Sequence, residues 1–343
     1  MAVSKASSGS VPQEAARSKP TLATTPPPVP DTTVAFPADY HHVMLVTLNR
    51  PDALNAIPRP QHYALERLWD WYDDEPSLRV AVITGTGRAF CAGADLKEWD
   101  GINSDPAAAA SQPGESPSQK SQSPSGAPSQ TNTAPDGSVT SAPATGRDRP
   151  TGRFPAGGFG GMSNRGGLKP IIAAVNGVCF GGGMEMAINC DLIIAASNAT
   201  FALPEVTIGV IALAGALPRL IRTVGKQRAS EMALSGKRYT AQEMREWGIV
   251  NEVVPQGAGK KQEGTLVLEK ALEWAAKIAG NSPDAVIVSR EGLKVGWEGV
   301  DAEKGTEMLL RGWYSKIEKG DNMKEGVKSF VERRKPVWVD SKL

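Results

Sequence analysis

The 343-residue sequence has few residues of the kinds that bind metal ions or form disulfide bonds. It contains three cysteines and three histidines. Cys91, Cys179 and Cys190 show neither a CxxC pair nor a metal-ligand spacing, and so small and odd a set is typical of a reducing compartment. The histidines all fall within residues 41–62. We therefore expect no metal site and no disulfide framework.

The sequence also lacks a charge imbalance and a long apolar run. It has 38 Lys and Arg against 37 Asp and Glu, for a net charge of +1. Near-neutrality gives no electrostatic basis for binding nucleic acid or an anionic membrane. No run approaches the roughly 18 apolar residues of a membrane helix. We expect neither nucleic-acid binding nor membrane insertion.

Several catalytic motifs are missing as well. There is no HExxH, no GxSxG, no Walker loop, and no GxGxxG that opens a helix after a strand. These absences argue against zinc peptidases, α/β-hydrolases, P-loop nucleotide hydrolases and dinucleotide-binding domains.

Composition divides the chain into ordered and unordered parts. Residues 1–33 are rich in Ser, Ala, Thr and Pro and predict a disordered leader, and residues 101–165 predict an inserted low-complexity segment. The end of that insertion, residues 154–165, mixes phenylalanines with glycines. Two interpretations stay open for it: a mobile lid over an apolar ligand, or a flexible linker.

The ordered parts alternate between strand and helix and then become all helical. Strands are predicted at 42–49, 79–85, 170–177 and 191–197, and an amphipathic helix at 60–74. A capping box at Thr240 to Glu243 opens a further helix. The prediction is an α/β core over 34–100 and 166–255, followed by a helical region over 256–338.

The stretch FGGGMEMAINCD, residues 180–191, carries the clearest chemical signal. Three consecutive glycines open a helix, and Glu185 follows among apolar residues. The glycines could simply turn the strand tightly into the helix, with Glu185 favouring the helix N-terminus. They could instead bring bare backbone N–H groups up to a ligand, with Glu185 as the reacting group beside them.

Four segments together resemble the crotonase family, the enoyl-CoA hydratase/isomerase group. They are LNRPDALNAI (48–57), GRAFCAGADLKEW (87–99), KPIIAAVNGVCFGGGMEMAINCDLIIAA (169–196) and the segment 199–254 that contains FALPE. The resemblance extends over about residues 40–100 and 165–335. It implies an α/β fold, a spiral of ββα units with a C-terminal helical region that forms trimers or hexamers.

The resemblance also implies a reaction and the residues that carry it. The substrate is an acyl-CoA, so coenzyme A enters with the substrate and no separate cofactor is expected. The backbone N–H groups of Ala94 and Gly182 correspond to an oxyanion hole for the thioester oxygen, where each donor is typically worth about 10²–10³ in rate. Glu185 and Glu205 correspond to the two glutamates of hydratases, which activate water and protonate Cα.

Residues for coenzyme A recognition are implied in the same way. The resemblance places Leu54, Asn55, Ala56, Ala92, Asp95 and Lys97 at the nucleotide and pantetheine, and the N–H of Leu213 at the water. The sequence departs from the family at Leu203 and over residues 212–219, which puts the identity of the acyl group in doubt more than the type of reaction.

The sequence ends in Ser341-Lys342-Leu343, a tripeptide read by the peroxisomal import receptor. It predicts a peroxisomal enoyl-CoA hydratase, in fatty-acid oxidation or a related acyl-CoA pathway. Three alternatives stay open. A Δ3,Δ2-enoyl-CoA isomerase needs only one carboxylate, a specialised hydratase of secondary metabolism shares the chemistry, and an RNA-binding relative would use basic clusters such as Arg333 to Lys335.

Overall fold

The computed structural model describes residues 21–98, 154–255 and 265–343. The larger of its two sheets has six strands in the order β1-β2-β3-β5-β7-β10. β1 is antiparallel to β2, and every other neighbouring pair is parallel. The strands are β1 (Thr32–Ala35), β2 (Val43–Leu48), β3 (Val80–Gly85), β5 (Ile171–Val175), β7 (Leu192–Ala196) and β10 (Glu252–Val254).

Both faces of this sheet are covered, which explains why its central strands are apolar throughout. In β3, Ala81 and Ile83 face a cluster that contains Leu65 of α1 (Arg59–Asp74). Val80 and Val82 face the opposite cluster, which contains Ala271 of α7 (Thr265–Ala279). α7 lies in the predicted helical region and is a helix, and it packs on the sheet as part of the core.

A second sheet has four short strands in the order β4-β6-β8-β9. β4, β6 and β8 are parallel, and β9 is antiparallel to β8. The chain places one strand in the large sheet and the next in the small one, and a helix follows. The elements concerned are β4 (Ala89–Cys91), β6 (Val178–Phe180), β8 (Thr200–Ala202), β9 (Tyr239–Thr240), α4 (Gly182–Ile188) and α5 (Ala216–Ser235). This repetition is the predicted spiral of ββα units.

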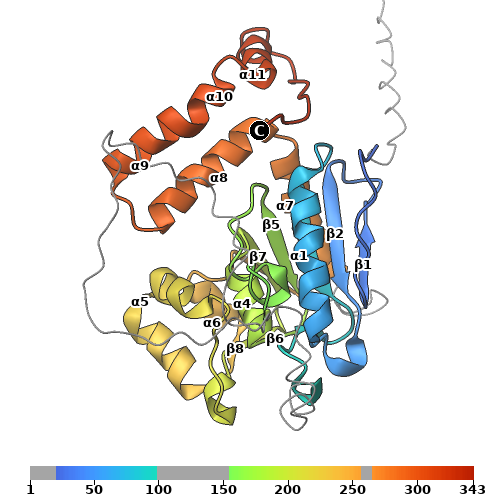
Figure 1. The fold of residues 1–343 in the computed structure, drawn as a ribbon, viewed down its shortest axis with the longest axis vertical. Helices are drawn as coiled ribbons and strands as arrows, with labels where there is room; N and C mark the ends of the chain where they lie inside the picture. Colours follow the sequence, from blue (N-terminus) through green and yellow to red (C-terminus); the bar gives the residue numbers. More distant parts are fainter. Residues whose placement is uncertain (1–20, 99–153, 256–264) are drawn as a thin grey trace, which may run out of the picture.

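The C-terminal part is helical, as predicted, and forms a layer at one end of the sheets (Figure 1). It comprises α8 (Pro283–Trp297), α9 (Ala302–Leu309), α10 (Ser315–Ile317) and α11 (Asp321–Val331). The predicted capping box is confirmed at α6 (Ala241–Glu246), where Thr240 and Glu243 each accept the other's backbone N–H. Among the described residues, no helix combines the length and apolarity needed to cross a membrane.

The predicted leader is wrong over its second half. Residues 1–20 lie outside the described ranges, but Leu22 and Val29 pack against the core, and β1 begins at Thr32. The N–H of Ala23 donates to Glu75 Oε2 at 2.9 Å, and Trp71 Nε1 donates to Thr24 Oγ1 at 2.7 Å. Partners on α1 and just after it thus order a composition that alone favours disorder.

The predicted insertion lies outside the described residues from 101 to 153, and its last part is not a mobile lid. Phe159 and Met162 are each 1% exposed. The N–H of Gly157 donates to Glu66 Oε1 at 2.7 Å, and Trp69 Nε1 donates to the Gly160 carbonyl at 3.0 Å. Residues 154–165, which we call the wall segment, are therefore fixed against α1.

Candidate active site

Three parallel strands of the small sheet end at the same pocket. The pairing of β4 with β6 brings Ala92 to Ala94 beside the glycines that follow Phe180. The pairing of β6 with β8 sets Phe180 opposite Ala202, and the N–H of Gly181 donates to the Ala202 carbonyl at 3.0 Å. The carboxyl ends of parallel strands are where α/β folds commonly bind ligands.

The pocket has a volume of about 120 Å³, below the roughly 300–1,000 Å³ typical of sites for drug-sized ligands. It therefore suits a short reacting group at the end of a longer ligand. Four predicted residues that carry chemistry meet there: Glu185, Glu205, Ala94 and Gly182. The other lining residues are Ala92, Gly93, Leu96, Phe154, Phe159, Gly181, Pro204, Ile208, Val210, Ile211 and Leu213.

Each of the three glycines is required by a close neighbour. Gly181 has φ +54° and ψ −124°, and a Cβ there would lie 3.0 Å from Glu205 Oε1. A Cβ on Gly182 would lie 2.4 Å from the ring of Phe159, and one on Gly183 would lie 2.2 Å from the Cys91 carbonyl oxygen. The glycines thus serve both interpretations of the motif, since they make the tight turn and bring the backbone up to the pocket.

The two predicted oxyanion donors have N–H groups for which the described residues supply no acceptor. Ile57 forms a β-bridge with the Ala94 segment, in which the Ile57 N–H donates to the Gly93 carbonyl and the Asp95 N–H donates to the Ile57 carbonyl. The N–H of Ala94 takes no part in this bridge. Gly182 is in the first turn of α4, where helices have N–H groups without intrahelical acceptors. A Cβ on Gly93 would lie 3.4 Å from the Gly182 nitrogen, so the two segments are adjacent.

Glu185 is buried, with only 3% of its surface exposed. Its Oε1 accepts the N–H of Ala214 at 2.8 Å and the N–H of Ala216 at 3.2 Å. The pKa of Glu185 is raised to about 7, first by burial and then by the negative charge of Glu205, while the N–H groups of Ala216, Ala214 and Gly215 act in the opposite direction. A carboxyl with a pKa near 7 exchanges protons readily at neutral pH, as a general acid or base requires.

Glu205 begins a short 3₁₀ helix, Glu205–Ile208, directly after β8. Burial raises its pKa as well. Its Oε2 is buried and accepts no hydrogen bond from the described residues, while Oε1 lies against Gly181. The Glu205 carboxyl therefore lines the pocket with a raised pKa and with one oxygen that the described residues leave without a hydrogen-bond partner.

The wall segment closes one side of the pocket with aromatic rings. Phe154 and Phe159 line the pocket, with ring centroids 5.8 Å apart. His62 of α1 packs behind them, 4.4 Å from Phe159, and its Nδ1 accepts the N–H of Gly160 at 2.9 Å. Burial lowers the pKa of His62 to about 3, so this ring is neutral and serves as packing.

Comparison with known proteins agrees with this geometry. The sequence profile of the enoyl-CoA hydratase/isomerase family matches residues 38–121 and 165–341. The chain belongs to the enoyl-CoA hydratase/isomerase family. It is 54% identical over 318 residues to the mevalonyl-coenzyme A hydratase SIDH of Beauveria bassiana, with 93% of this chain and 98% of that protein covered.

Two further comparisons point the same way. The mevalonyl-coenzyme A hydratase sidH of Aspergillus fumigatus is 43% identical over 317 residues, covering 92% of this chain and 98% of the relative. The crystal structure of an enoyl-CoA hydratase from Bacillus anthracis has a TM-score of 0.68 and 29% identity, covering 90% of this chain and 98% of that one. As a member of this family, the chain is an enzyme with the hydro-lyase chemistry of enoyl-CoA hydratases.

The residues predicted to bind coenzyme A divide into two groups. Ala92 and Leu213 line the pocket, whereas Leu54, Asn55, Ala56, Asp95 and Lys97 are not among its lining residues. Asn55 donates to the Thr86 and Ala89 carbonyls, at 2.9 and 2.8 Å, and accepts the N–H of Arg50. In this structure Asn55 therefore holds the loop that supports the Ala92–Ala94 segment.

Asp95 and Lys97 lie at the edge of the site. Asp95 pairs with Arg50 at 3.0 Å, which ties it to the same supporting loop. Lys97 is exposed, and its N–H donates to Asp95 Oδ1 at 3.3 Å. A contact of either residue with coenzyme A stays a prediction.

Sequence reasoning missed what holds Glu185. The hydrogen bonds come from Ala214 and Ala216, for which the sequence analysis gave no role; the N–H of Leu213 was predicted to hold the water, and that stays a prediction. Leu213 is 71% exposed at the mouth of the pocket. Gly215, with φ +121°, turns the chain so that its two neighbours point their N–H groups at the same oxygen. A glycine between two alanines after the F-x-x-P-E segment was the available signal.

Proposed function

We propose that this enzyme interconverts mevalonyl-CoA and its 2,3-dehydrated product by removing or adding water. The observation that carries the proposal is the small pocket in which both glutamates meet two backbone N–H groups that have no acceptor in the described part of the chain. The names of the two relatives at 54% and 43% identity supply the acyl group. They favour the specialised alternative over a fatty-acid intermediate.

The chemistry needs one proton shared between two carboxyls. For dehydration, Glu205 takes the proton from C2, Glu185 gives a proton to the departing C3 hydroxyl, and the N–H groups of Ala94 and Gly182 stabilise the enolate oxygen. Hydration runs through the same steps in reverse, with Glu185 ionised and Glu205 protonated. Either direction begins with a single proton on the pair, whose two carboxyls influence each other's titration.

Two carboxyls in one pocket support hydration over isomerisation, which needs one. The pocket, with a volume of about 120 Å³ and with Phe154 and Phe159 in its lining, supports a short acyl group. The decisive experiment incubates the purified enzyme with mevalonyl-CoA and with crotonyl-CoA and follows loss or gain of one water by mass spectrometry. Turnover of crotonyl-CoA with none of mevalonyl-CoA would overturn the choice of substrate.

We further propose that the chain self-associates through its C-terminal helices, as the family resemblance implies. Support comes from their exposed apolar residues, among them Phe330 at 85% and Val331 at 74% exposure. Light scattering of the purified protein tests this, and a particle of single-chain mass at micromolar concentration would contradict it.

Peroxisomal import through Ser341-Lys342-Leu343 is also proposed. In the structure Ser341 Oγ donates to Asp284 Oδ1 at 2.5 Å, and Lys342 pairs with Asp321 at 3.2 Å. The Lys342 side chain is nevertheless 83% exposed, so the tail lies at the surface. An N-terminal fluorescent fusion should give peroxisomal puncta that disappear when the three residues are removed; puncta that persist would contradict the proposal.

A further inference from the structure

Ser163 lies where the wall segment meets the loop that holds Glu185. Its side chain is buried, with 0% exposure. Ser163 Oγ accepts the N–H of Phe159 at 2.7 Å and donates to the Ala214 carbonyl at 2.6 Å. The N–H of Ala214 in turn donates to Glu185 Oε1 at 2.8 Å. One hydroxyl thus links the aromatic wall of the pocket to the residue that fixes a catalytic carboxyl.

The backbones at this junction are in close contact. A Cβ on Gly158 would lie 2.4 Å from Ser163 Oγ and 3.0 Å from the Ala214 carbonyl oxygen. A Cβ on Gly215 would lie 2.9 Å from the Ser163 carbonyl oxygen. Because no larger residue fits at either glycine, a shift of the wall segment must displace the loop around Ala214.

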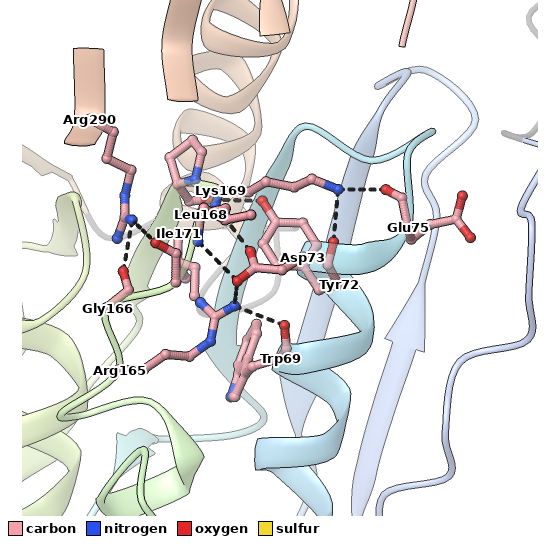
Figure 2. A network of polar contacts seen from close by, with 12 residues as sticks. Trp69, Tyr72, Asp73, Glu75, Arg165, Gly166, Leu168, Lys169, Ile171 and Arg290 are labelled. Carbon is pink, nitrogen blue, oxygen red and sulfur yellow. Dashed lines mark hydrogen bonds and ion pairs between the residues drawn. The ribbon is translucent and has the colours of Figure 1, made fainter. Parts of the chain in front are cut away.

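The other end of the wall segment is anchored independently, as Figure 2 shows. Arg165 pairs with Asp73 of α1 and donates to the Trp69 carbonyl at 2.9 Å. The N–H groups of Leu168 and Lys169 donate to the same Asp73 carboxylate at 2.9 and 3.0 Å. Motion of the wall is therefore restrained at residues 165–169, and the end that bears Phe159 depends on Ser163 and on α1.

Ser163 carries no charge, so any effect on Glu185 must pass through the position of Ala214. The charged groups that act on Glu185 are Glu205, from the 3₁₀ helix, and Arg219, on α5. Arg219 also donates to Asn164 Oδ1 of the wall segment at 3.4 Å, and Asn189 at the end of α4 donates to the Met162 carbonyl at 2.6 Å. Among these links, the hydrogen bond from Ala214 is the one that joins Ser163 to the Glu185 carboxyl itself.

We propose that Ser163 is a positioning residue, which holds the Ala214 N–H on Glu185 and makes that contact depend on how the acyl group packs against Phe159. The proposal rests on the proposed role of Glu185 in hydration, but not on which acyl-CoA is the substrate. It accounts for a buried hydroxyl that neither contacts the pocket nor belongs to the family motifs.

The test replaces Ser163 by Ala and by Thr and compares pH profiles. Ser163→Ala should lower kcat/KM by up to about 100-fold, the effect of a small displacement of a catalytic group. A loosened N–H no longer favours the ionised form of Glu185, so the pKa of Glu185 should rise. In hydration of crotonyl-CoA, which needs Glu185 ionised, the acidic limb should move to higher pH. In dehydration of mevalonyl-CoA, which needs Glu185 protonated, the basic limb should move to higher pH. Ser163→Thr keeps the hydroxyl and should restore both values.

A matched control separates positioning from stability. Ser329 is likewise buried, at 3% exposure, and donates to the Gly326 carbonyl at 3.0 Å, but it lies on α11. Ser329→Ala should lower the melting temperature by an amount comparable to that in Ser163→Ala and leave the pH profile unchanged. If Ser163→Ala does not fold, Ser163→Cys, of similar size but weaker hydrogen bonding, should show a smaller shift in the same direction.

The measurements distinguish failure of this inference from failure of the proposed function. Both mevalonyl-CoA and crotonyl-CoA are assayed, so turnover of either substrate is enough to record the pH profiles. The infrared carbonyl band of protonated Glu185, identified by its loss in Glu185→Gln, follows the same titration without substrate. The overturning results are a Glu185-governed limb (acidic for crotonyl-CoA, basic for mevalonyl-CoA) and an infrared titration that both stay at the wild-type pH in Ser163→Ala, or a Ser163→Thr variant no better than Ser163→Ala.

Discussion

The α/β core and the C-terminal helices differ in how far their large apolar side chains are exposed. The core buries even its largest side chains, such as Phe159 and Phe201 at 1% and 0% exposure. The C-terminal helices leave Phe330 and Val331 at 85% and 74%, and Leu310 at 52%. The interior of the core therefore completes its own packing, although Ile211 and Leu213 in the lining of the pocket are 60% and 71% exposed. The helical layer presents apolar surface that another copy of the chain is proposed to cover.

Replacing either glutamate by a residue that cannot exchange a proton should have the largest effect on activity. Both the core and the C-terminal helices should stay folded. Glu205→Gln and Glu185→Gln keep the size of the side chain, and each should lower kcat by about 10²–10⁴. Steady-state kinetics with circular dichroism of the same samples provides the measurement. A Glu205→Gln enzyme with near-normal hydratase activity would contradict the two-carboxyl mechanism and favour a single-base reaction.

A methyl group added to a glycine should act oppositely in the two regions. In Gly182→Ala the new Cβ would lie 2.4 Å from the Phe159 ring, so the wall or the oxyanion donor must move. We expect a loss of about 10² in kcat/KM. The matched control is Gly296→Ala in α8, where a Cβ meets nothing within 4 Å. Gly296→Ala should retain activity, and its free energy of unfolding should rise by up to about 1 kcal/mol. An equal loss of activity in both variants would contradict the comparison.

The buried Glu185 carboxyl should make the stability of the core depend on pH. Its pKa is raised from 4.5 to about 7, so the folded state holds the proton more tightly than the unfolded state. Wild-type stability should therefore fall as the pH rises from about 4.5 to 7, by on the order of 3 kcal/mol. Glu185→Gln lacks this loss, and its advantage in thermal unfolding should appear only above pH 5. An advantage independent of pH would contradict the assignment.

A charge on the exposed apolar face should weaken self-association with the smallest effect on the chemistry. Phe330→Asp should shift the mass measured by light scattering towards a single chain, whereas Phe330→Leu should not. The change in kcat should stay within about twofold if the core completes its own pocket. A parallel collapse of activity would show that the site depends on the helical layer.

Short motifs were the part of the site that could be predicted from the sequence. One pocket contains Glu185, Glu205, Ala94 and Gly182. Each lies shortly after a strand of the small sheet, and each of these strands can be recognised from its local sequence. The sequence analysis misjudged residues 21–33 and the wall segment. Their composition indicates only that neither segment can form a packed core by itself. It does not report partners such as Glu75, Glu66 and Trp69, which lie far away in the sequence.

The sequence by itself determined the alternation of strands and helices, the glycine turn and the choice of the two carboxyls proposed to react, since these depend on residue type and short spacing. Only the tertiary structure decided the hydrogen bonds from Ala214 and Ala216 to Glu185, its raised pKa, and the position of Ser163 between wall and loop. Those features arise where segments about 30 to 50 residues apart come into contact, Ala214 with Glu185 and with Ser163. Burial and hydrogen bonding at such contacts are properties of the folded chain alone.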